Sequence, residues 1–200
     1  DKLGMHKSYN ILEHSKFINN LNEIKNIFLF FKIEKANTFD EKILKMTSIL
    51  NEYFHSDGTI PLFNGSNNIY TKTIYSSLNK ENYLKKRDFL NIPNGIAFYS
   101  DKNKKVFFDV VQPNKDLISS NLSAGTLSLE LSGFGEKILT NCGASESFGK
   151  NPEYLRYSAA HSTIILQNTN ISEIKVGTPH VKFPQSVVFR KETNPEQEIL

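Results

Sequence analysis

The stretch "TLSLELSGFGEKILTN", residues 126–141, decides the fold of the second half of the chain. Apolar and polar residues alternate in its first part, and the Gly-Phe-Gly at 133–135 separates that part from "EKILTN". This pattern is typical of an antiparallel hairpin closed by a tight turn. The runs at 95–100 and 105–111 lie on either side of "DKNKK" in the same way, so they predict a second hairpin.

Two further runs contain many β-branched residues and predict additional strands, "STIIL" at 162–166 and "VKFPQSVVFRK" at 181–191. We therefore expect at least six short strands after residue 95. Antiparallel strands of this kind bury their apolar side chains most simply against a second sheet, so we expect an antiparallel β-sandwich in this half.

The first sixty residues have a helical period instead of an alternating one. In the first predicted helix, apolar residues three or four positions apart form one face: Phe17, Ile18, Leu21, Ile24, Phe28 and Phe31. The second helix is expected to start at Thr38, a candidate N-cap, because Glu41 follows three residues later as a capping box requires. It should end before Asp57 and Gly58. The two helices are expected to form an antiparallel pair whose broad apolar faces need further partners.

The change of period divides the chain. We expect an α+β multidomain fold with a helical domain at 1–68, a linker at 69–95 and a sheet domain at 96–200. The stretch before the linker, residues 55–68, is rich in turn-forming residues, and a short helix is expected within the linker from Tyr70 to Leu84. The first residues have neither an initiator methionine nor the apolar core of a signal peptide, so we expect the chain to be a fragment of a longer protein.

The composition excludes several classes of protein. The 24 basic residues are spread among 21 acidic ones, and the net charge of +3 is too small and diffuse to indicate nucleic-acid binding. A local basic cleft could still hold an acidic polymer. The longest apolar cluster, residues 27–31, is far shorter than the roughly 20 residues that span a bilayer, so no membrane span is expected. The single cysteine, Cys142, excludes an internal disulfide, and it has no adjacent histidine or basic residue to activate it.

Four short motifs of the chain together resemble those of one known protein family. "SAGTLSLELSGFGEKILTNCGA" (123–144) and "RYSAAHSTIIL" (156–166) are similar to two motifs of that family's C-terminal sheet domain. "HSDGTIPLFNGS" (55–66) looks like the loop that closes the family's helical toroid, and "MHKSYNIL" (5–12) is similar to its Ser-Pro-Ser-Tyr-His stretch. The family that these motifs resemble is the heparinase II/III family. The motifs occur in that family's order, which makes the resemblance specific. It implies the C-terminal helices of an incomplete α/α toroid followed by stacked antiparallel sheets, in agreement with the layout above.

The resemblance also implies a function, because members of the family are polysaccharide lyases that cleave uronic-acid polymers by β-elimination. Such an enzyme removes the proton α to a carboxylate, and fixed donors must stabilise the anion that develops. By alignment of "HKSYN", Tyr9 matches the family's catalytic tyrosine, and His161 is the second candidate catalytic residue, lining the cleft between the domains. The Asn or His that neutralises the substrate carboxylate lies earlier in the family, and this chain does not contain it.

Arg156 and Glu130 are the candidate substrate-binding residues. A guanidinium matches a carboxylate with two parallel hydrogen bonds, so Arg156 suits an acidic sugar; the alternative is a surface salt bridge. Glu130 lies between two leucines and could be a buried functional carboxylate, although alternation alone places it on the solvent face. For His161 the alternative is a hydrogen bond to a neighbouring strand or loop, and for Tyr9 it is an ordinary place in the core.

No metal or other cofactor is expected. In several members of the family a zinc ion takes a His, an Asp and a second His, and the matching positions here are Ser123, Asn141 and His161. One imidazole with a hydroxyl and a neutral amide holds zinc poorly, so the zinc site looks degraded. Asn141 is instead expected in a tight turn with Gly143. The remaining histidines in the first half show no ligand spacing and are assigned to the surface or to caps: His6, His14 and His55.

The leading hypothesis is a fragment of a heparinase II/III-like lyase that acts on an acidic polysaccharide in the bacterial periplasm or outside the cell. A non-catalytic carbohydrate-binding or structural relative that has lost the zinc site is the alternative. A hydrolase that uses the same fold is the third hypothesis. No oligomeric state is predicted.

Overall fold

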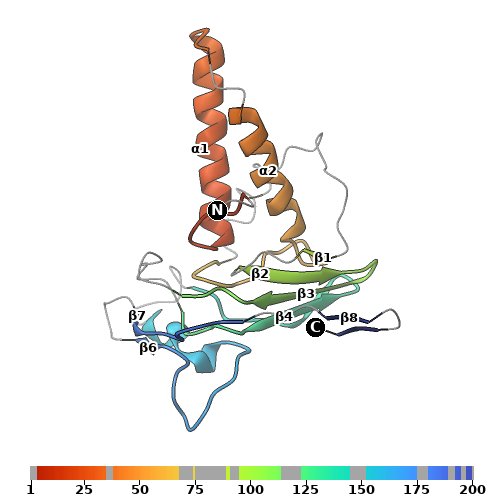
Figure 1. The fold of residues 1–200 in the computed structure, drawn as a ribbon, viewed down its shortest axis with the longest axis vertical. Helices are drawn as coiled ribbons and strands as arrows, with labels where there is room; N and C mark the ends of the chain where they lie inside the picture. The colour runs from red at the N-terminus through yellow and green to blue at the C-terminus, as the bar shows by residue number, and fades with distance from the viewer. Residues whose placement is uncertain are drawn as a thin grey trace.

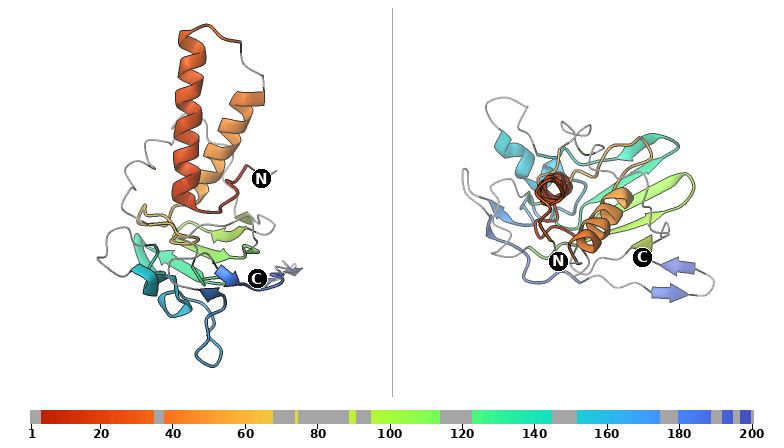
Figure 2. Two further views of the ribbon diagram at one scale, coloured as in Figure 1. Left: turned by 90° about the vertical axis from the view of Figure 1, so that its left-hand side faces the viewer. Right: turned by 90° about the horizontal axis from the view of Figure 1, so that it is seen from above.

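Two helices stand on an antiparallel sheet in the computed structural model of the chain (Figure 1). The structure describes residues 4–34, 38–67, 74, 89–90, 95–113, 123–144, 152–174, 180–188, 192–194 and 197–199. Helix α1 (Ile11–Phe30) meets the sheet with its N-terminal end, and α2 (Thr38–Glu52) meets it with its C-terminal end. Seen from above, both helices lie over the strands (Figure 2). No described helix is long and apolar enough to cross a membrane.

Helix α1 confirms the first predicted helix, and local hydrogen bonds define both of its ends. The Asn10 side chain caps the start by accepting from the backbone N–H of Glu13 at 3.0 Å. After the last turn, Lys32 has a left-handed φ of 53°. The N–H of Ile33 then donates to the carbonyl of Phe28 at 2.8 Å, as in a Schellman motif.

The apolar face of α1 finds its described partners only near the sheet. Ile18 is fully buried, whereas Phe17 and Ile24 are 42% and 39% exposed. Several apolar side chains farther along are also exposed in the described part of the chain: Ile27, Leu29, Phe30, Phe31 and Ile33. The far half of α1 therefore presents an apolar surface that the described residues do not cover.

Helix α2 starts at Thr38, as predicted. Its buried face consists mainly of aliphatic side chains at helical spacing: Ile43, Met46, Ile49 and Leu50. The helix ends at Glu52, before the predicted stop, and the N–H of Thr59 donates to Asp57 Oδ1 at 2.9 Å in the turn that follows. This turn directs the chain back along the sheet.

Among the described residues, the main sheet has five strands in sequence order, each antiparallel to the next. The strands are β1 (Phe89–Leu90), β2 (Ile96–Ser100), β3 (Lys104–Asp109), β4 (Leu129–Gly133) and β5 (Glu136–Leu139). Both predicted hairpins are confirmed, because β2 pairs with β3 and β4 pairs with β5. Phe134 and Gly135 have φ values of 54° and 86°, the left-handed pair of a two-residue hairpin turn.

Two smaller pairs of strands follow the main sheet. They are β6 (Glu173–Ile174) with β7 (His180–Lys182), and β8 (Glu192–Asn194) with β9 (Gln197–Ile199). In the described residues 181–188, only Val181 and Lys182 of the strand predicted at 181–191 lie in a strand. The helix predicted from Tyr70 to Leu84 lies outside the described residues, apart from Ile74.

The strand predicted at 162–166 is wrong. Residues 162–165 lie in no strand, and Leu166 makes only an isolated bridge with Thr169. The N–H of Ser162 donates to the Asn141 side chain at 2.8 Å, and its carbonyl accepts from Leu129 at 3.2 Å. The backbone groups of Ser162 are thus used by the segments packed beside it, so the β-branched composition alone was misleading.

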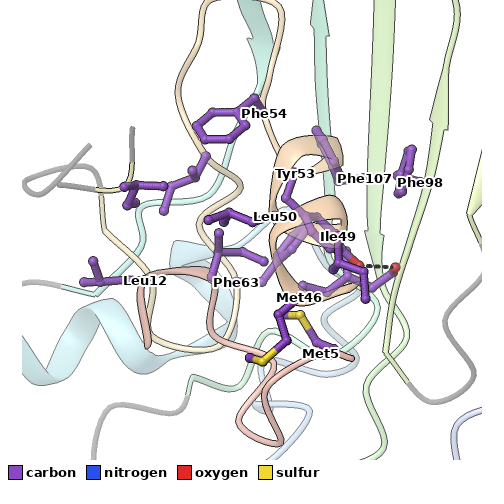
Figure 3. Packing of buried hydrophobic residues seen from close by; sticks show 14 of the residues in the cluster. Met5, Leu12, Met46, Ile49, Leu50, Tyr53, Phe54, Phe63, Phe98 and Phe107 are labelled. Atoms are coloured by element: carbon purple, nitrogen blue, oxygen red, sulfur yellow. Dashed lines mark hydrogen bonds between the residues drawn. The ribbon is translucent and has the colours of Figure 1, made fainter. Parts of the chain in front are cut away.

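One hydrophobic cluster joins the helices to the sheet (Figure 3). It contains side chains from the N-terminal loop, both helices, the loop after α2 and strands β2 and β3. Tyr53 connects the two halves: its ring centroid lies 5.8 Å from that of Phe98 and 6.0 Å from that of Phe107. Its hydroxyl donates to the carbonyl of Ile96 at 2.9 Å. The helical residues and the sheet therefore share one core.

Replacing Tyr53 by Phe should lower the free energy of unfolding by about 1–3 kcal/mol, because the Ile96 carbonyl would stay buried without this donor. Denaturant unfolding followed by circular dichroism measures the change. Tyr154→Phe is the matched control, since the Tyr154 side chain is exposed, and it should change the free energy by less than about 0.5 kcal/mol. Equal losses in the two variants would contradict the role given to the buried hydroxyl.

Candidate functional site

Tyr9 lies in the loop before α1 with a left-handed backbone, at φ 51°. Its N–H donates to the carbonyl of His6 at 3.0 Å, and its own carbonyl accepts from Asn64 Nδ2 at 3.4 Å. The side chain packs against the hydrophobic cluster and is partly buried. Burial raises the pKa of the Tyr9 phenol above its ordinary value, so the phenol is protonated near neutral pH.

The loop at 60–67 holds the segment around Tyr9, residues 4–11, through the polar side chains of both. Asn10 Nδ2 donates to the carbonyl of Asn64 at 3.0 Å. The Ser66 hydroxyl donates to Asn10 Oδ1 at 3.1 Å and accepts from the N–H of Ile11 at 3.0 Å. The motif that resembles a toroid-closing loop therefore lies directly against the segment with the candidate tyrosine.

Glu130 is fully buried, which corrects the solvent-face position that alternation predicted. One carboxylate oxygen, Oε1, accepts from the N–H of Leu62 and from both the N–H and Nδ2 of Asn141, each at 3.0 Å. The other, Oε2, accepts from His55 Nε2 at 2.7 Å and lies 3.8 Å from Lys137 Nζ. Burial opposes ionisation, but these donors outweigh it, and the pKa of Glu130 lies below its usual value.

His55 and His14 are buried, so their assignment to the surface or to caps is wrong. The His55 ring meets Phe107 edge-on, with centroids 4.8 Å apart. His14 Nε2 lies 2.9 Å from the carbonyl of Met46, and its Nδ1 accepts from the N–H of His6 at 3.1 Å. Burial lowers the pKa of His14 to about 4, so this ring is neutral near pH 7. Both histidines serve as internal hydrogen-bonding groups between segments.

Asn141 bridges two segments, and its backbone φ is not positive. Its Nδ2 donates to Glu130, and its Oδ1 accepts from the N–H of Ser162 at 2.8 Å. Gly143 does have a positive φ, of 71°. A Cβ on this glycine would lie 2.8 Å from the carbonyl oxygen of Ser66, so only glycine allows this close approach of two backbones.

His161 packs on Gly125 and hydrogen-bonds to a loop carbonyl. Its Nε2 lies 3.0 Å from the carbonyl of Leu155, and a Cβ on Gly125 would lie 3.2 Å from the ring. Because a carbonyl only accepts, Nε2 carries the proton and Nδ1 has the lone pair. Burial lowers the pKa of His161, so the ring is neutral near pH 7. Arg156 is nearly buried, and its Nη1 lies 3.2 Å from Glu153 Oε2.

The three positions that the resemblance aligns with zinc ligands, Ser123, Asn141 and His161, lie on segments that meet, but their donors do not suit zinc. The N–H of Ala124 donates to the carbonyl of Arg156 at 2.7 Å, which joins the Ser123 segment to that of His161. Both amide atoms of Asn141 are engaged by Glu130 and Ser162. In the described part of the chain, no group of three or more His, Cys, Asp or Glu side chains is placed to hold a metal.

A cavity of about 640 Å³ opens beside the Tyr9 segment, between the N-terminal loop and the two helices. Its described lining includes the basic residues Lys7, Lys42 and Lys45, together with Phe17, and it includes no acidic residue. The cavity is therefore suited to a negatively charged ligand with an apolar face. Hydrophobic periodicity did not indicate it, because its lysines come from two separate segments.

Asp109 is a buried carboxyl group that the sequence patterns do not reveal. It ends β3, and one of its oxygens accepts from the N–H of Val111 at 3.1 Å. Burial raises the pKa of Asp109 to about 7, although hydrogen bonds from Val111 and Asn64 act in the opposite direction. The only signal in the sequence was an aspartate inside the apolar run "VFFDVV". Since Asn64 also contacts Tyr9, this carboxyl belongs to the surroundings of the candidate site.

A family model described as "Heparinase II/III-like, C-terminal" matches residues 88–200. This range includes the five-stranded sheet, Glu130, Asn141 and His161. No curated protein sequence matches the chain.

Solved heparinase structures share the fold over most of the chain. A crystal structure of heparinase III has a TM-score of 0.73 at 14% identity and covers 97% of this chain and 35% of its own. Heparan sulfate lyase HepC from Pedobacter heparinus has a TM-score of 0.65 at 15% identity, with coverages of 88% and 33%. This chain thus spans about a third of the length of those proteins, and at these identities the likeness shows the fold alone.

Asp109→Asn should make the stability of the protein less dependent on pH. The raised pKa means that Asp109 favours folding below its unfolded pKa of about 4 and that this contribution is lost as the pH rises to about 7. An asparagine keeps the acceptor oxygen without the charge. The stability of the variant relative to the wild type should therefore rise by about 1 kcal/mol per pH unit between pH 4 and 7. Chemical denaturation across this pH range tests the sign, and a constant difference would refute it.

Proposed function

Because this chain belongs to the heparinase II/III-like family, we propose that it is part of a polysaccharide lyase that cleaves an acidic, uronate-containing polymer by β-elimination. The proposal concerns the full-length protein, since the chain spans about a third of the heparinases that it resembles. One of these is a heparan sulfate lyase, which supports an acidic polysaccharide as the class of substrate.

The backbone of Tyr9 is the observation that carries the proposal. A φ of 51° is unfavourable for a bulky side chain and costs on the order of 1–3 kcal/mol. Such strain persists where surrounding contacts enforce it, and it is concentrated at functional sites. Here the contacts that enforce the conformation come from His6 and Asn64. Asn64 lies in the stretch at 55–66, which is one of the four motifs that resemble the heparinase II/III family. A tyrosine held in this way suits the catalytic role that the resemblance implies.

The protonation states of Tyr9 and His161 suit opposite halves of an elimination. His161 is neutral with a lone pair on Nδ1, so it can accept the proton α to the substrate carboxylate. The electrons of that C–H bond form the carbon–carbon double bond as the bond from the β carbon to the leaving oxygen breaks. Tyr9 has a raised pKa and keeps its proton, so it can protonate this oxygen. Fixed donors are still needed to stabilise the negative charge that develops on the substrate during this step.

Basic residues near Tyr9 suit an acidic polymer. The cavity lined by Lys7, Lys42 and Lys45 could attract carboxylates or sulfates of a chain that passes Tyr9. Arg156 would contact an acidic sugar only by exchanging or sharing its partner Glu153. No nucleic acid is proposed as a partner.

The complete protein is proposed to have the architecture that the resemblance implies. The helices would be the last of an incomplete α/α toroid up to residue 68, and a β-sandwich would start near residue 96, after a linker at 69–95. The exposed apolar half of α1 supports further helices beside it. A periplasmic or extracellular location fits a polymeric acidic substrate.

A non-catalytic carbohydrate-binding relative is the second candidate, favoured by the unsuitable donors at Ser123 and Asn141. If the zinc ion of related proteins supports activity, its loss would leave a protein that binds a polysaccharide without cleaving it. A hydrolase on the same fold would differ by its products.

The full-length protein should release unsaturated uronate products from heparan sulfate, alginate or hyaluronan, detected by their ultraviolet absorbance. Tyr9→Phe removes the proton donor and should lower kcat by at least about 100-fold, within the range for general acid–base groups. His161→Asn should have an effect of similar size, because the amide is a poor base. Tyr154→Phe, at an exposed tyrosine, is the control and should leave kcat unchanged.

Binding of the polymers without unsaturated products would favour the non-catalytic candidate. New reducing ends without unsaturation would favour a hydrolase. Full activity in Tyr9→Phe would exclude the catalytic role proposed for this residue.

We propose that the three positions Ser123, Asn141 and His161 hold no tight zinc ion. Elemental analysis should therefore find the same zinc content in the purified full-length protein and in its His161→Asn variant. Both are prepared at the same zinc concentration. The double variant Ser123→His/Asn141→Asp restores the donor types that the resemblance implies and should gain about one zinc per chain. Stoichiometric zinc in the wild type that is lost in His161→Asn would overturn the proposal.

A further inference from the structure

We propose that Glu130 is a positioning residue whose buried carboxylate holds the segments of Tyr9 and His161 in register. The inference rests on the proposed function only for its kinetic consequence. With no exposed surface, the Glu130 carboxylate acts on a substrate only through the groups that it holds. These groups lie on both sides of the junction between the helical residues and the sheet.

Two chains of hydrogen bonds, called arms below, start at Glu130. The first arm runs from Glu130 through Leu62 and its loop towards Tyr9. Oε1 accepts from the N–H of Leu62, at the start of the loop that carries Asn64 and Ser66. Asn64 donates to the carbonyl of Tyr9, and Ser66 binds Asn10 and the first N–H of α1. The loop therefore transmits the position of Glu130 to the backbone that holds Tyr9 in its strained conformation.

The second arm runs from Glu130 towards His161. The same oxygen, Oε1, accepts from the N–H and Nδ2 of Asn141, and Asn141 Oδ1 accepts from the N–H of Ser162. Ser162 directly follows His161, so the hydrogen bonds of the Asn141 side chain fix the position of the backbone that carries the His161 imidazole. The arms also meet away from Glu130, because the N–H of Ala144 donates to the carbonyl of Ser66 at 3.0 Å.

The site requires a carboxylate because its partners in the described part of the chain are all donors. Oε1 receives three N–H groups, and Oε2 receives His55 Nε2 with Lys137 nearby. A glutamine of the same size keeps one acceptor oxygen but turns an NH₂ group towards one set of these donors. Hydrogen bonds to a buried charged group contribute more than neutral ones, so this exchange should loosen both arms without leaving a large cavity.

Hydrogen–deuterium exchange of the full-length protein, read by mass spectrometry, tests the arms separately from activity. Glu130→Gln should raise amide exchange by about tenfold or more in both the 4–11 and the 156–163 segments, relative to β2 and β3. Asn141→Ala cuts only the second arm, so it should raise exchange in 156–163 and leave 4–11 unchanged. Leu50→Ala, in the shared core, is the stability control and should not raise exchange in the two segments relative to β2 and β3.

The kinetic test compares the change in kcat with the change in KM for each variant. Glu130→Gln should lower kcat by about tenfold or more while KM changes by less than about threefold, since the variant disturbs alignment and touches no substrate. Leu50→Ala, with a comparable loss of thermal stability, should keep the wild-type kcat.

Several outcomes would overturn the inference. Unchanged exchange in both segments of Glu130→Gln, or a rise in only one of them, would do so whether or not the protein is active. A fall in kcat of equal size in Leu50→Ala would mean that Glu130 affects kcat only through the stability of the protein. If the wild type cleaves no polymer, the proposed lyase function fails, while the exchange data still decide whether Glu130 links the two segments.

Discussion

The hydrogen bonding of one buried carboxylate, that of Glu130, is the constraint on which the arrangement of the two halves depends. A buried charge is tolerated only when donors surround it. Here the donors come from His55 and Leu62 after α2 and from Asn141 after β5. These segments are distant in sequence, so the carboxylate is satisfied only when the helices rest on the sheet in this register. The hydrophobic cluster around Tyr53 also joins the helices to the sheet, but apolar packing tolerates a change of alignment better than polar contacts do.

The same junction explains how a strained tyrosine is maintained. The left-handed backbone of Tyr9 would relax in an isolated loop, but Asn64 and His6 bind its carbonyl and its N–H. Asn64 is itself held between the Tyr9 segment and the buried carboxyl of Asp109. Polar side chains from the helical residues and the sheet thus converge on one loop. That convergence is the physical basis for regarding the junction as a site rather than as ordinary packing.

Asn141 shows how a single amide side chain can connect two segments at the junction. An amide can donate to Glu130 and accept from Ser162 at the same time, which an ionised carboxylate cannot do. An aspartate at this position would bring a second negative charge towards Glu130 and would need a cation to compensate it. Hydrogen bonds can therefore connect the β5 and His161 segments without metal coordination.

Local periodicity was sufficient to predict the two helices, both hairpins and the order of helices before sheet, because each depends on residues close in sequence. The family was evident from four short motifs, two of which contain Tyr9 and His161. Alternation misplaced Glu130 and ligand spacing misplaced His55 and His14, since neither pattern reveals the donors that distant segments bring to a buried group. The strand predicted at 162–166 failed for the same reason, because Asn141 and Leu129 use the backbone of Ser162. The sequence by itself determined the elements and the family; only the tertiary structure decided which polar groups are buried together, because that pairing exists only after the helices and the sheet have met.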